Sequence, residues 1–408
     1  MLNSLQKLEI FADAAKYDAS CASSGAAPRT ADAKSIGSTA PGMGICHAYA
    51  PDVRCISLLK VLLTNYCMFD CHYCVSRVSS NVARARFSVK EVVDLTLGFY
   101  RRNMIEGLFL SSGIVRSPDE TMEQVVAVAR SLREEHGFRG YIHLKTIPDA
   151  APELLAEAGR LADRLSINVE LPQESDLARL ALQKDGRRIR KAMANLRQRI
   201  DGAREDRKRS AKAPPFSTSQ STQMIVGADA ATDATVLGTS ETLYGSYGLS
   251  RVYYSAFSPI PDASKLLPLQ APPLMREHRL YQADWLLRYY GFNVPEIVTG
   301  TRDGMLDLQL DPKTAWALAN RAQFPVDLNR APREMLLRVP GLGVRVADRI
   351  LAVRKRRGLH LEDLTRLCRS VKALLPFIVC TDWRPTKLAD TANLRERLVP
   401  RATQLSLL

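Results

Sequence analysis

Three cysteines within one octapeptide are the residues of this chain best suited to chemistry. Residues 67–74 read Cys-Met-Phe-Asp-Cys-His-Tyr-Cys, so Cys67, Cys71 and Cys74 follow the spacing C-x3-C-x2-C. A short loop with this spacing can turn three thiolates toward one metal centre, and soft thiolates suit iron-sulfur clusters or zinc. The next cysteine along the chain is Cys368, so we expect one metal position to stay open.

The open position separates a reactive metal site from a closed one. His72 could close the site as a fourth ligand, but its neighbours Cys71 and Tyr73 leave it little freedom to point at the same metal. A closed site would be a structural zinc or a plain iron-sulfur knuckle. The apolar residues 58–64 predict a buried strand that ends where the loop begins, and this strand together with the open position favours the reactive site.

The octapeptide, with an aromatic residue before its last cysteine, resembles the signature of the radical S-adenosylmethionine enzymes. The resemblance covers roughly residues 55–260. It implies that Cys67, Cys71 and Cys74 hold a [4Fe-4S] cluster whose fourth iron chelates the amino and carboxylate groups of S-adenosylmethionine. It further implies that one electron from the cluster releases a 5'-deoxyadenosyl radical, and that the fold is a (β/α)6 partial TIM barrel.

Strands and helices are predicted to alternate after the cysteine loop. Ser88 begins a capping box, and Ser117 precedes a proline at a first helical position. The predicted strands after residues 58–64 are 107–111, 141–147, 165–170, 219–227 and 251–257, and the predicted helices are 88–103, 117–136, 151–162, 175–210 and 229–248. Six strand-helix units predict an α/β fold with a parallel sheet, a barrel or partial barrel whose site lies at the carboxyl ends of the strands.

Side chains two apart on a strand share a face, and several such pairs are polar. His143 and Lys145 share one face of their predicted strand, as do Ser221 and Gln223 of theirs. Ser166, Asn168 and Glu170 alternate with apolar residues in the same way. So many inward polar groups predict a lumen that holds a zwitterionic, nucleotide-like ligand.

The resemblance also implies cofactor-binding residues. Tyr73 occupies the position of an aromatic residue that lies against adenine. The second strand ends Ser-Ser-Gly where the family usually has Gly-Gly-Glu, so the cofactor ammonium group would rest on backbone carbonyls and serine hydroxyls. Asn168 and Glu170 match the positions that bind the ribose, and Gly227 matches a glycine near the adenine. The implied set is Tyr73, Ser111, Ser112, Gly113, Asn168, Glu170 and Gly227.

Further residues have both a functional and a structural interpretation. Lys145 can reach the cofactor carboxylate or a substrate phosphate, or it can be a surface lysine. Tyr253 and Tyr254 are candidate radical relays or base-stacking residues, with core packing as the alternative. Cys21 is a further catalytic candidate. Together with Cys46 and Cys55, it could hold a second cluster or relay a hydrogen atom, or the three could be reduced, packed thiols.

A second motif lies near the C-terminus. Residues 326–357 resemble a helix-hairpin-helix DNA-binding module, with the hairpin Pro-Gly-Leu-Gly at 340–343. Gly341 and Gly343 permit a sharp turn close to a phosphate, Leu342 is expected to point inward, and the second helix begins near Val344 with its amides facing the anion. Arg345 and Arg349 add positive charge on this helix. The alternative is a protein-interaction hairpin.

Charge and cysteine usage limit the class of protein. The 408 residues carry a formal net charge of +14, which suits a polyanionic partner or an arginine-rich surface. A basic run within residues 175–210 predicts an amphipathic helix, with phosphate binding as a second role. Eight cysteines do not indicate a disulfide framework in a chain of this length, and no signal or membrane segment is apparent, so we expect a cytoplasmic protein.

Together the two motifs resemble radical S-adenosylmethionine proteins proposed to act in DNA modification or repair. The expected partners are DNA, a reductant such as flavodoxin or ferredoxin, and a uracil-DNA-glycosylase-like protein. The alternatives are an RNA- or tRNA-modifying radical enzyme and a non-catalytic iron-sulfur protein that binds DNA. The expected domains are an N-terminal extension (1–54), the partial barrel (55–305), a small all-α helix-hairpin-helix domain (311–383) and a tail (384–408).

Overall fold

A computed structural model describes most of the chain, and the chain divides into two units. The described residues are 2–15, 45–49, 55–368, 371–386 and 393–399. The first unit is formed by Met1–Ala231 and Thr242–Pro272, and the second by Thr232–Glu241 and Pro273–Leu408. Cys21 lies outside the described residues. No helix in the described ranges has both the length and the apolar character needed to cross a membrane.

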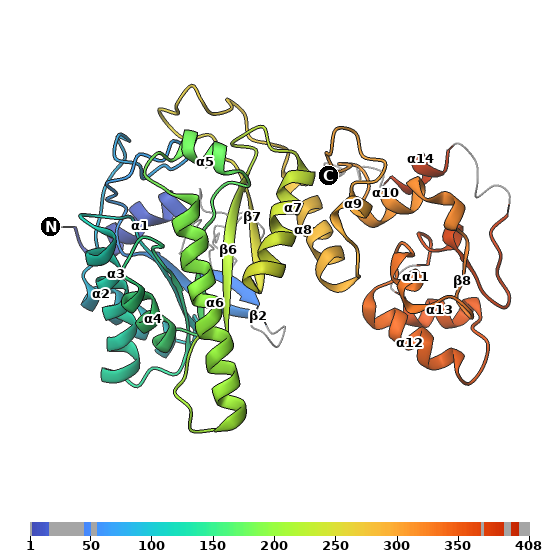
Figure 1. The fold of residues 1–408 in the computed structure, drawn as a ribbon, viewed down its shortest axis with the longest axis horizontal. Helices are drawn as coiled ribbons and strands as arrows, with labels where there is room; N and C mark the ends of the chain where they lie inside the picture. Colours follow the sequence, from blue (N-terminus) through green and yellow to red (C-terminus); the bar gives the residue numbers. More distant parts are fainter. Residues whose placement is uncertain (1, 16–44, 50–54, 369–370, 387–392, 400–408) are drawn as a thin grey trace, which may run out of the picture. The chain divides into compact units, whose positions relative to one another are not determined.

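The first unit is built on a curled sheet in which the strands follow one another in chain order (Figure 1). The strands are β1 (Ile45–Tyr49), β2 (Cys55–Leu62), β3 (Gly107–Ser111), β4 (Tyr141–Lys145), β5 (Arg164–Ser166), β6 (Ser219–Val226) and β7 (Arg251–Ala256). β2 to β7 are parallel, whereas β1, which the sequence did not reveal, pairs antiparallel with β2. The predicted α/β partial barrel is confirmed.

The helices that follow β2 connect the parallel strands and cover the outside of the sheet, whereas the N-terminal helix precedes β1 (Figure 1). The helices are α1 (Ser4–Ala15), α2 (Val89–Arg101), α3 (Pro118–Arg130), α4 (Pro152–Leu161), α5 (Glu174–Leu180), α6 (Gly186–Arg209) and α7 (Asp233–Tyr247), and α3 continues as a π-helical turn over Ser131–Glu135. Ser88 forms the predicted capping box with Glu91 at the start of α2. Lys7 of α1 binds the same Glu91 at 2.7 Å, so the N-terminal helix is tied to this cap.

Two predicted elements are shorter than expected. The helix predicted over 175–210 is interrupted between α5 and α6, because Asp185 caps a new helix by accepting hydrogen bonds from the amides of Arg187 and Arg188. The strand predicted over 165–170 ends at Ser166, and Glu170 has a φ of +66°, which a β-strand does not accommodate. Asn168 and Glu170 therefore lie on a loop beyond β5.

The second unit is helical apart from a two-residue ladder. Its helices are α8 (Leu274–Tyr289), α9 (Val294–Ile297), α10 (Pro312–Ala319), α11 (Arg333–Arg338), α12 (Val344–Arg354), α13 (Leu361–Leu367) and α14 (Leu394–Leu398), with 3-10 turns at Arg321–Gln323 and Leu375–Phe377. The strands β8 (Val326–Asp327) and β9 (Ile378–Val379) pair in parallel. The fully buried side chains of Leu336, Ile350 and Phe377 form part of its core.

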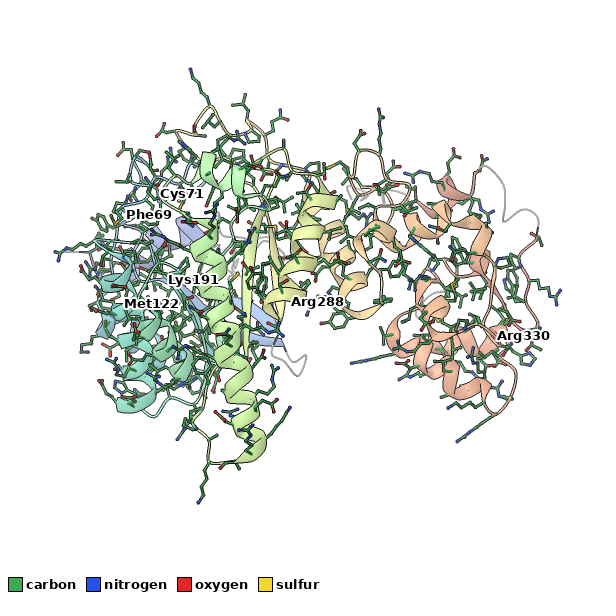
Figure 2. The ribbon with its side chains drawn as sticks, in the orientation of Figure 1. Phe69, Cys71, Met122, Lys191, Arg288 and Arg330 are labelled. Carbon is green, nitrogen blue, oxygen red and sulfur yellow. The ribbon has the colours of Figure 1, made fainter. Side chains whose placement is uncertain are left out.

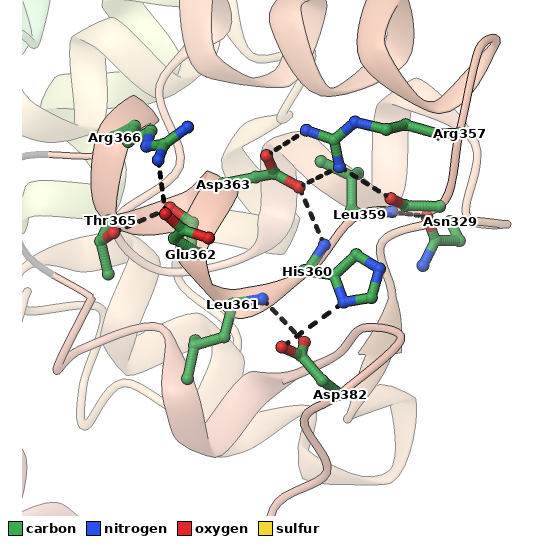
Figure 3. A network of polar contacts seen from close by, with 11 residues as sticks. Asn329, Arg357, Leu359, His360, Leu361, Glu362, Asp363, Thr365, Arg366 and Asp382 are labelled. Atoms are coloured by element: carbon green, nitrogen blue, oxygen red, sulfur yellow. Dashed lines mark hydrogen bonds and ion pairs between the residues drawn. The ribbon is translucent and has the colours of Figure 1, made fainter.

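A polar network fixes the segment that leads into α13 (Figure 3). Asn329 accepts a hydrogen bond from the Leu359 amide at 2.8 Å, and Asp382 accepts one from the Leu361 amide at 2.8 Å. Asp363 accepts from the His360 amide at 3.0 Å and pairs with Arg357. Since these contacts satisfy backbone donors that no helix bond reaches, they define where α13 begins.

The predicted hairpin joins α11 and α12 within the second unit. Gly341 has a φ of +80°, a conformation that favours glycine, and Leu342 is buried as expected. Beneath the turn, the Lys313 ammonium group donates to the Leu342 carbonyl at 2.5 Å and lies 4.6 Å from the centre of the Tyr290 ring. Burial lowers the pKa of Lys313 to about 7, so this lysine loses its charge far more readily than an exposed one.

Replacing Lys313 should remove a pH dependence of stability. The pKa of Lys313 is about 7 in the folded chain and 10.5 ordinarily, so the unfolded chain binds more protons between these values and the free energy of unfolding rises with pH there. Between pH 7 and pH 9.5, the free energy of unfolding of the wild type should rise by about 3 kcal/mol more than that of Lys313→Met. Urea unfolding measures both values. The exposed Lys355→Met is the control, and parallel curves for wild type and Lys313→Met would contradict the prediction.

Candidate functional site

The carboxyl ends of the parallel strands surround one cavity of about 260 Å³. All three cysteines of the octapeptide line it, together with residues from the ends of β3, β4 and β5. The sequence-predicted residues that line it are Cys67, Cys71, Tyr73, Cys74, Ser111, Ser112, Gly113, Lys145, Asn168 and Glu170. Most of the side chains singled out from the sequence are thus brought to one place by the parallel register.

The cysteine loop is held by backbone contacts to neighbouring segments. The Met68 amide donates to the Ile114 carbonyl at 2.7 Å, and the His72 amide donates to the Leu180 carbonyl at 2.8 Å. The Arg84 guanidinium adds a second anchor because it donates to four carbonyls at 2.5–2.9 Å, those of Asn65, Ser76, Arg77 and Ser80. These contacts fix the path of the loop from both sides, so its thiols face the cavity. Figure 2 labels Cys71 and Phe69 on this loop.

Two of the three thiols of the loop, those of Cys71 and Cys74, resist ionisation. Burial raises the pKa of Cys71 to about 12 and also raises the pKa of Cys74. A coordinating metal deprotonates such a thiol outright. Within the described ranges, no three His, Cys, Asp or Glu side chains stand close enough to hold a single metal ion. A [4Fe-4S] cluster differs, because each thiolate binds a separate iron.

A partly buried ion pair lies beside the cysteines. The Lys184 ammonium group binds the Glu170 carboxylate at 2.5 Å and lies 6.0 Å from the centre of the Tyr73 ring. Burial alone would raise the pKa of Glu170, but the Lys184 charge outweighs it and lowers that pKa. Burial opposes the charge on Lys184 as well, yet the Glu170 carboxylate raises its pKa. Both groups therefore stay charged.

The Tyr73 hydroxyl is an unsatisfied polar group in this wall. Its oxygen is buried and makes no hydrogen bond of good geometry to the described residues, although the Cys71 thiol lies close to it, and burial raises the pKa of Tyr73 well above its usual value. A buried polar atom without a partner is rare in folded proteins and calls for an explanation such as a missing ligand. Tyr73 thus offers a polar atom to a molecule that binds in the cavity.

His143, two residues before Lys145 on β4, is an uncharged residue of the lumen wall. This ring stacks on Phe109 with centroids 4.2 Å apart, and its Nε2 lies 2.8 Å from the Ser166 hydroxyl. Burial, with the nearby positive charges of Arg164, Lys145 and Lys60, lowers the pKa of His143 well below its ordinary value. His143 is therefore neutral at pH 7, and it cannot supply positive charge to a ligand.

Other sequence-predicted residues lie elsewhere. Gly227 has a φ of +82° and packs against Pro272 at a turn, and it does not line the cavity. The Tyr254 side chain is fully buried in the core, where strand alternation directs it. The Tyr253 hydroxyl lies 3.3 Å from the Arg164 guanidinium, outside the cavity lining. Cys46 is a buried thiol on β1, packed with Ile56 and Leu58.

No family model matches the chain and no curated protein matches its sequence, but several solved structures are similar to part of it. The chain is similar to the FeFe-hydrogenase maturase HydG from Carboxydothermus hydrogenoformans at 16% identity, over 56% of this chain and 50% of that chain, with a TM-score of 0.42. It is similar to methylornithine synthase (PylB) at 15% identity, over 64% and 68%, with a TM-score of 0.43.

A third similar structure is OxsB, a cobalamin-dependent S-adenosylmethionine radical enzyme with aqua-cobalamin and S-adenosylmethionine bound. The identity is 13%, the alignment covers 65% of this chain and 40% of that chain, and the TM-score is 0.33. This chain spans about half the length of the HydG structures that it matches. All of these similarities are low, so the function proposed below rests on the side chains of the cavity.

Lys184 is one residue of this site that the sequence did not reveal. The sequence predicts one long helix over 175–210, and a lysine within such an amphipathic helix is expected on its solvated face. The helix break covers residues 181–185, between α5 and α6, and the pair Asp185 and Gly186 was the available turn signal. Lys60 and Asp149 also line the cavity without having been predicted to do so.

Lys184→Met should destabilise the chain by about 3 kcal/mol at pH 7, since it leaves the Glu170 carboxylate buried without its cation. The pKa of Glu170 is lowered in the folded chain, so the pair stabilises above the ordinary pKa of 4.5 and this contribution is lost as the pH falls through the lower folded value. The double variant Lys184→Met, Glu170→Gln should recover much of the loss in urea unfolding. Lys90 is exposed, so Lys90→Met serves as the control. Equal losses of stability in Lys184→Met and Lys90→Met would refute the prediction.

Proposed function

We propose that this chain is a radical S-adenosylmethionine enzyme that acts on DNA. The observation that carries the proposal is the convergence of Cys67, Cys71 and Cys74 on a cavity lined by polar strand-end residues. The three thiols suit a [4Fe-4S] cluster, and the orphaned Tyr73 hydroxyl suits a further ligand beside it. When bound, the cluster and S-adenosylmethionine would supply a 5'-deoxyadenosyl radical, with the electron coming from a reductant such as flavodoxin or ferredoxin.

The protein groups around the cavity have complementary roles toward such a cofactor. S-adenosylmethionine carries an ammonium group, a carboxylate and a sulfonium. Lys145 is a cation available to the carboxylate, and Glu170, held ionised by Lys184, is an acceptor available to ribose hydroxyls or to the ammonium group. Ser111, Ser112 and Gly113 contribute hydroxyls and backbone carbonyls where the related family has a carboxylate. The apolar wall of Phe69 and Ile114 limits water in the cavity.

DNA is the proposed substrate because of the hairpin in the second unit. Arg345 and Arg349 are exposed one turn apart on α12, and neither forms an ion pair with the described residues. Their charge, the turn at Gly341 and the start of α12 offer contacts to phosphates. Such contacts carry little base information, so binding should tolerate many sequences. A target base inside a duplex would first have to be unstacked.

Anaerobic reconstitution tests the chemistry. Protein loaded with iron and sulfide, then given dithionite and S-adenosylmethionine, should form 5'-deoxyadenosine, and Cys71→Ala should form none because one cluster ligand is lost. Liquid chromatography with mass spectrometry measures the product. A loaded wild type that releases no 5'-deoxyadenosine would point instead to a non-catalytic iron-sulfur protein.

Salt-dependent binding tests the substrate class. Arg345→Gln with Arg349→Gln should lower the slope of log affinity against log salt by about 2 and weaken DNA binding of any sequence, because two phosphate contacts are removed. Arg333→Gln is the control, since its guanidinium is engaged by Asp348 at 2.7 Å. Fluorescence anisotropy with DNA and tRNA measures both quantities, and stronger retention on tRNA would favour an RNA-modifying enzyme.

A further inference from the structure

Helix α6 of the first unit carries a dense set of cations that differ in their ion pairing. Five of them have a carboxylate partner within 4 Å: Arg188, Arg190, Arg197, Arg204 and Lys208. Arg187, Lys191, Arg199, Arg207 and Arg209 are exposed and form no ion pair with any described residue. A subset of the cations of this helix thus has no neighbouring carboxylate that compensates its charge.

The unpaired cations near the middle of α6 belong to a second cavity. Lys191 and Arg199 line a hollow of about 350 Å³ between α6 and the start of α4, with Arg188 and Asn195 on the same wall. Positions 188, 191, 195 and 199 recur every three or four residues, so their side chains project from one face of the helix. At 1.5 Å per residue, this face spans about 16 Å. We call Arg188, Lys191, Asn195 and Arg199 the α6 track.

The charge of this hollow is strongly unbalanced. Its lining holds three cations and a single carboxylate, that of Asp149, which Arg188 already approaches to 3.6 Å. Like charges that face one concave surface raise each other's energy unless an anion lies between them. The track is therefore suited to a ligand with several negative charges spaced along a line.

The hollow shares part of its lining with the cysteine cavity. Pro148 and Asp149, which follow β4, line both spaces. Figure 2 shows Lys191 on α6 and Cys71 on the loop at the strand ends of the same unit. A polyanionic strand lying along the track would thus pass the segment that borders the proposed active site. A single small anion would use only part of the track.

We propose that the α6 track binds the phosphodiester backbone of the DNA strand whose nucleotide enters the cysteine cavity. The inference rests on the proposed action on DNA and adds a second contact region, on the first unit, to the hairpin of the second. Lys191 and Arg199 contact phosphates directly, and the amide of Asn195 donates to the backbone between them. Arg188 stays bound to Asp149 and marks the end of the track nearest the cavity.

Two double variants test the track in the full, cluster-loaded chain. Lys191→Gln with Arg199→Gln should lower the salt slope of DNA binding by about 2 and weaken affinity about tenfold near 0.1 M salt. Arg207→Gln with Arg209→Gln removes the same charge from unpaired positions of α6 outside the hollow, and its affinity should stay within about twofold of wild type. Anisotropy with fluorescein-labelled single-stranded and duplex oligonucleotides gives both quantities.

Equal losses of DNA affinity in the two double variants would overturn the proposal, because net charge alone would then explain the binding. Cluster loading and 5'-deoxyadenosine formation without DNA, measured on the same samples, report the proposed chemistry separately. The Arg345 and Arg349 variants report the hairpin separately. If the wild-type chain does not bind DNA, both the proposed role of the α6 track and the proposed substrate class are wrong.

A second measurement needs no variant. In the wild-type chain, bound DNA should slow the reaction of the Lys191 amine with an acylating reagent at least fivefold, followed by peptide mass spectrometry, because a contacting phosphate shields the amine. Lys90, an exposed lysine of α2 whose carboxylate partner is Asp94, is the internal reference. Equal rates at Lys191 with and without DNA would overturn the proposal.

Discussion

The parallel hydrogen-bond register of β2 to β7 is the constraint on which the candidate site depends. Because neighbouring strands run in the same direction, the loop after β2 and the segments after β3, β4 and β5 all leave the sheet at one edge. Cys67, Lys145 and Glu170 are far apart in the chain and meet for this reason alone. A one-residue slip at any pair would turn a polar lumen residue toward the covering helices.

Electrostatics inside the cavity is set by burial as much as by the number of charges. The Glu170 and Lys184 pair keeps two ions in a poorly solvated wall, because each stabilises the charged form of the other. The same burial leaves Cys71 protonated and His143 neutral. Burial in this wall thus suppresses the charge of Cys71 and His143, whereas it leaves the mutually paired Glu170 and Lys184 charged.

On the surface, pairing decides which cations remain available. Helix α6 carries many arginines, but several of these are engaged by neighbouring carboxylates, as Arg190 is by Glu174. Arg333 at the start of α11 is engaged in the same way by Asp348 of α12. Exposed ion pairs of this kind contribute little to stability. They do lower the local positive potential, so a polyanion is attracted most strongly to surfaces whose cations have no ion-pair partner.

The sequence by itself determined the cysteine loop, the alternation of strands and helices, the hairpin turn and several of the polar residues that line the cavity. These features are local, since they depend on spacing, capping and side-chain alternation. Only the tertiary structure decided that β5 stops at Ser166, that Lys184 turns inward to Glu170, and that Gly227 packs at a turn instead of lining the cavity. Such outcomes depend on which segments meet across the barrel, and long-range packing of this kind leaves no periodic signal in the chain.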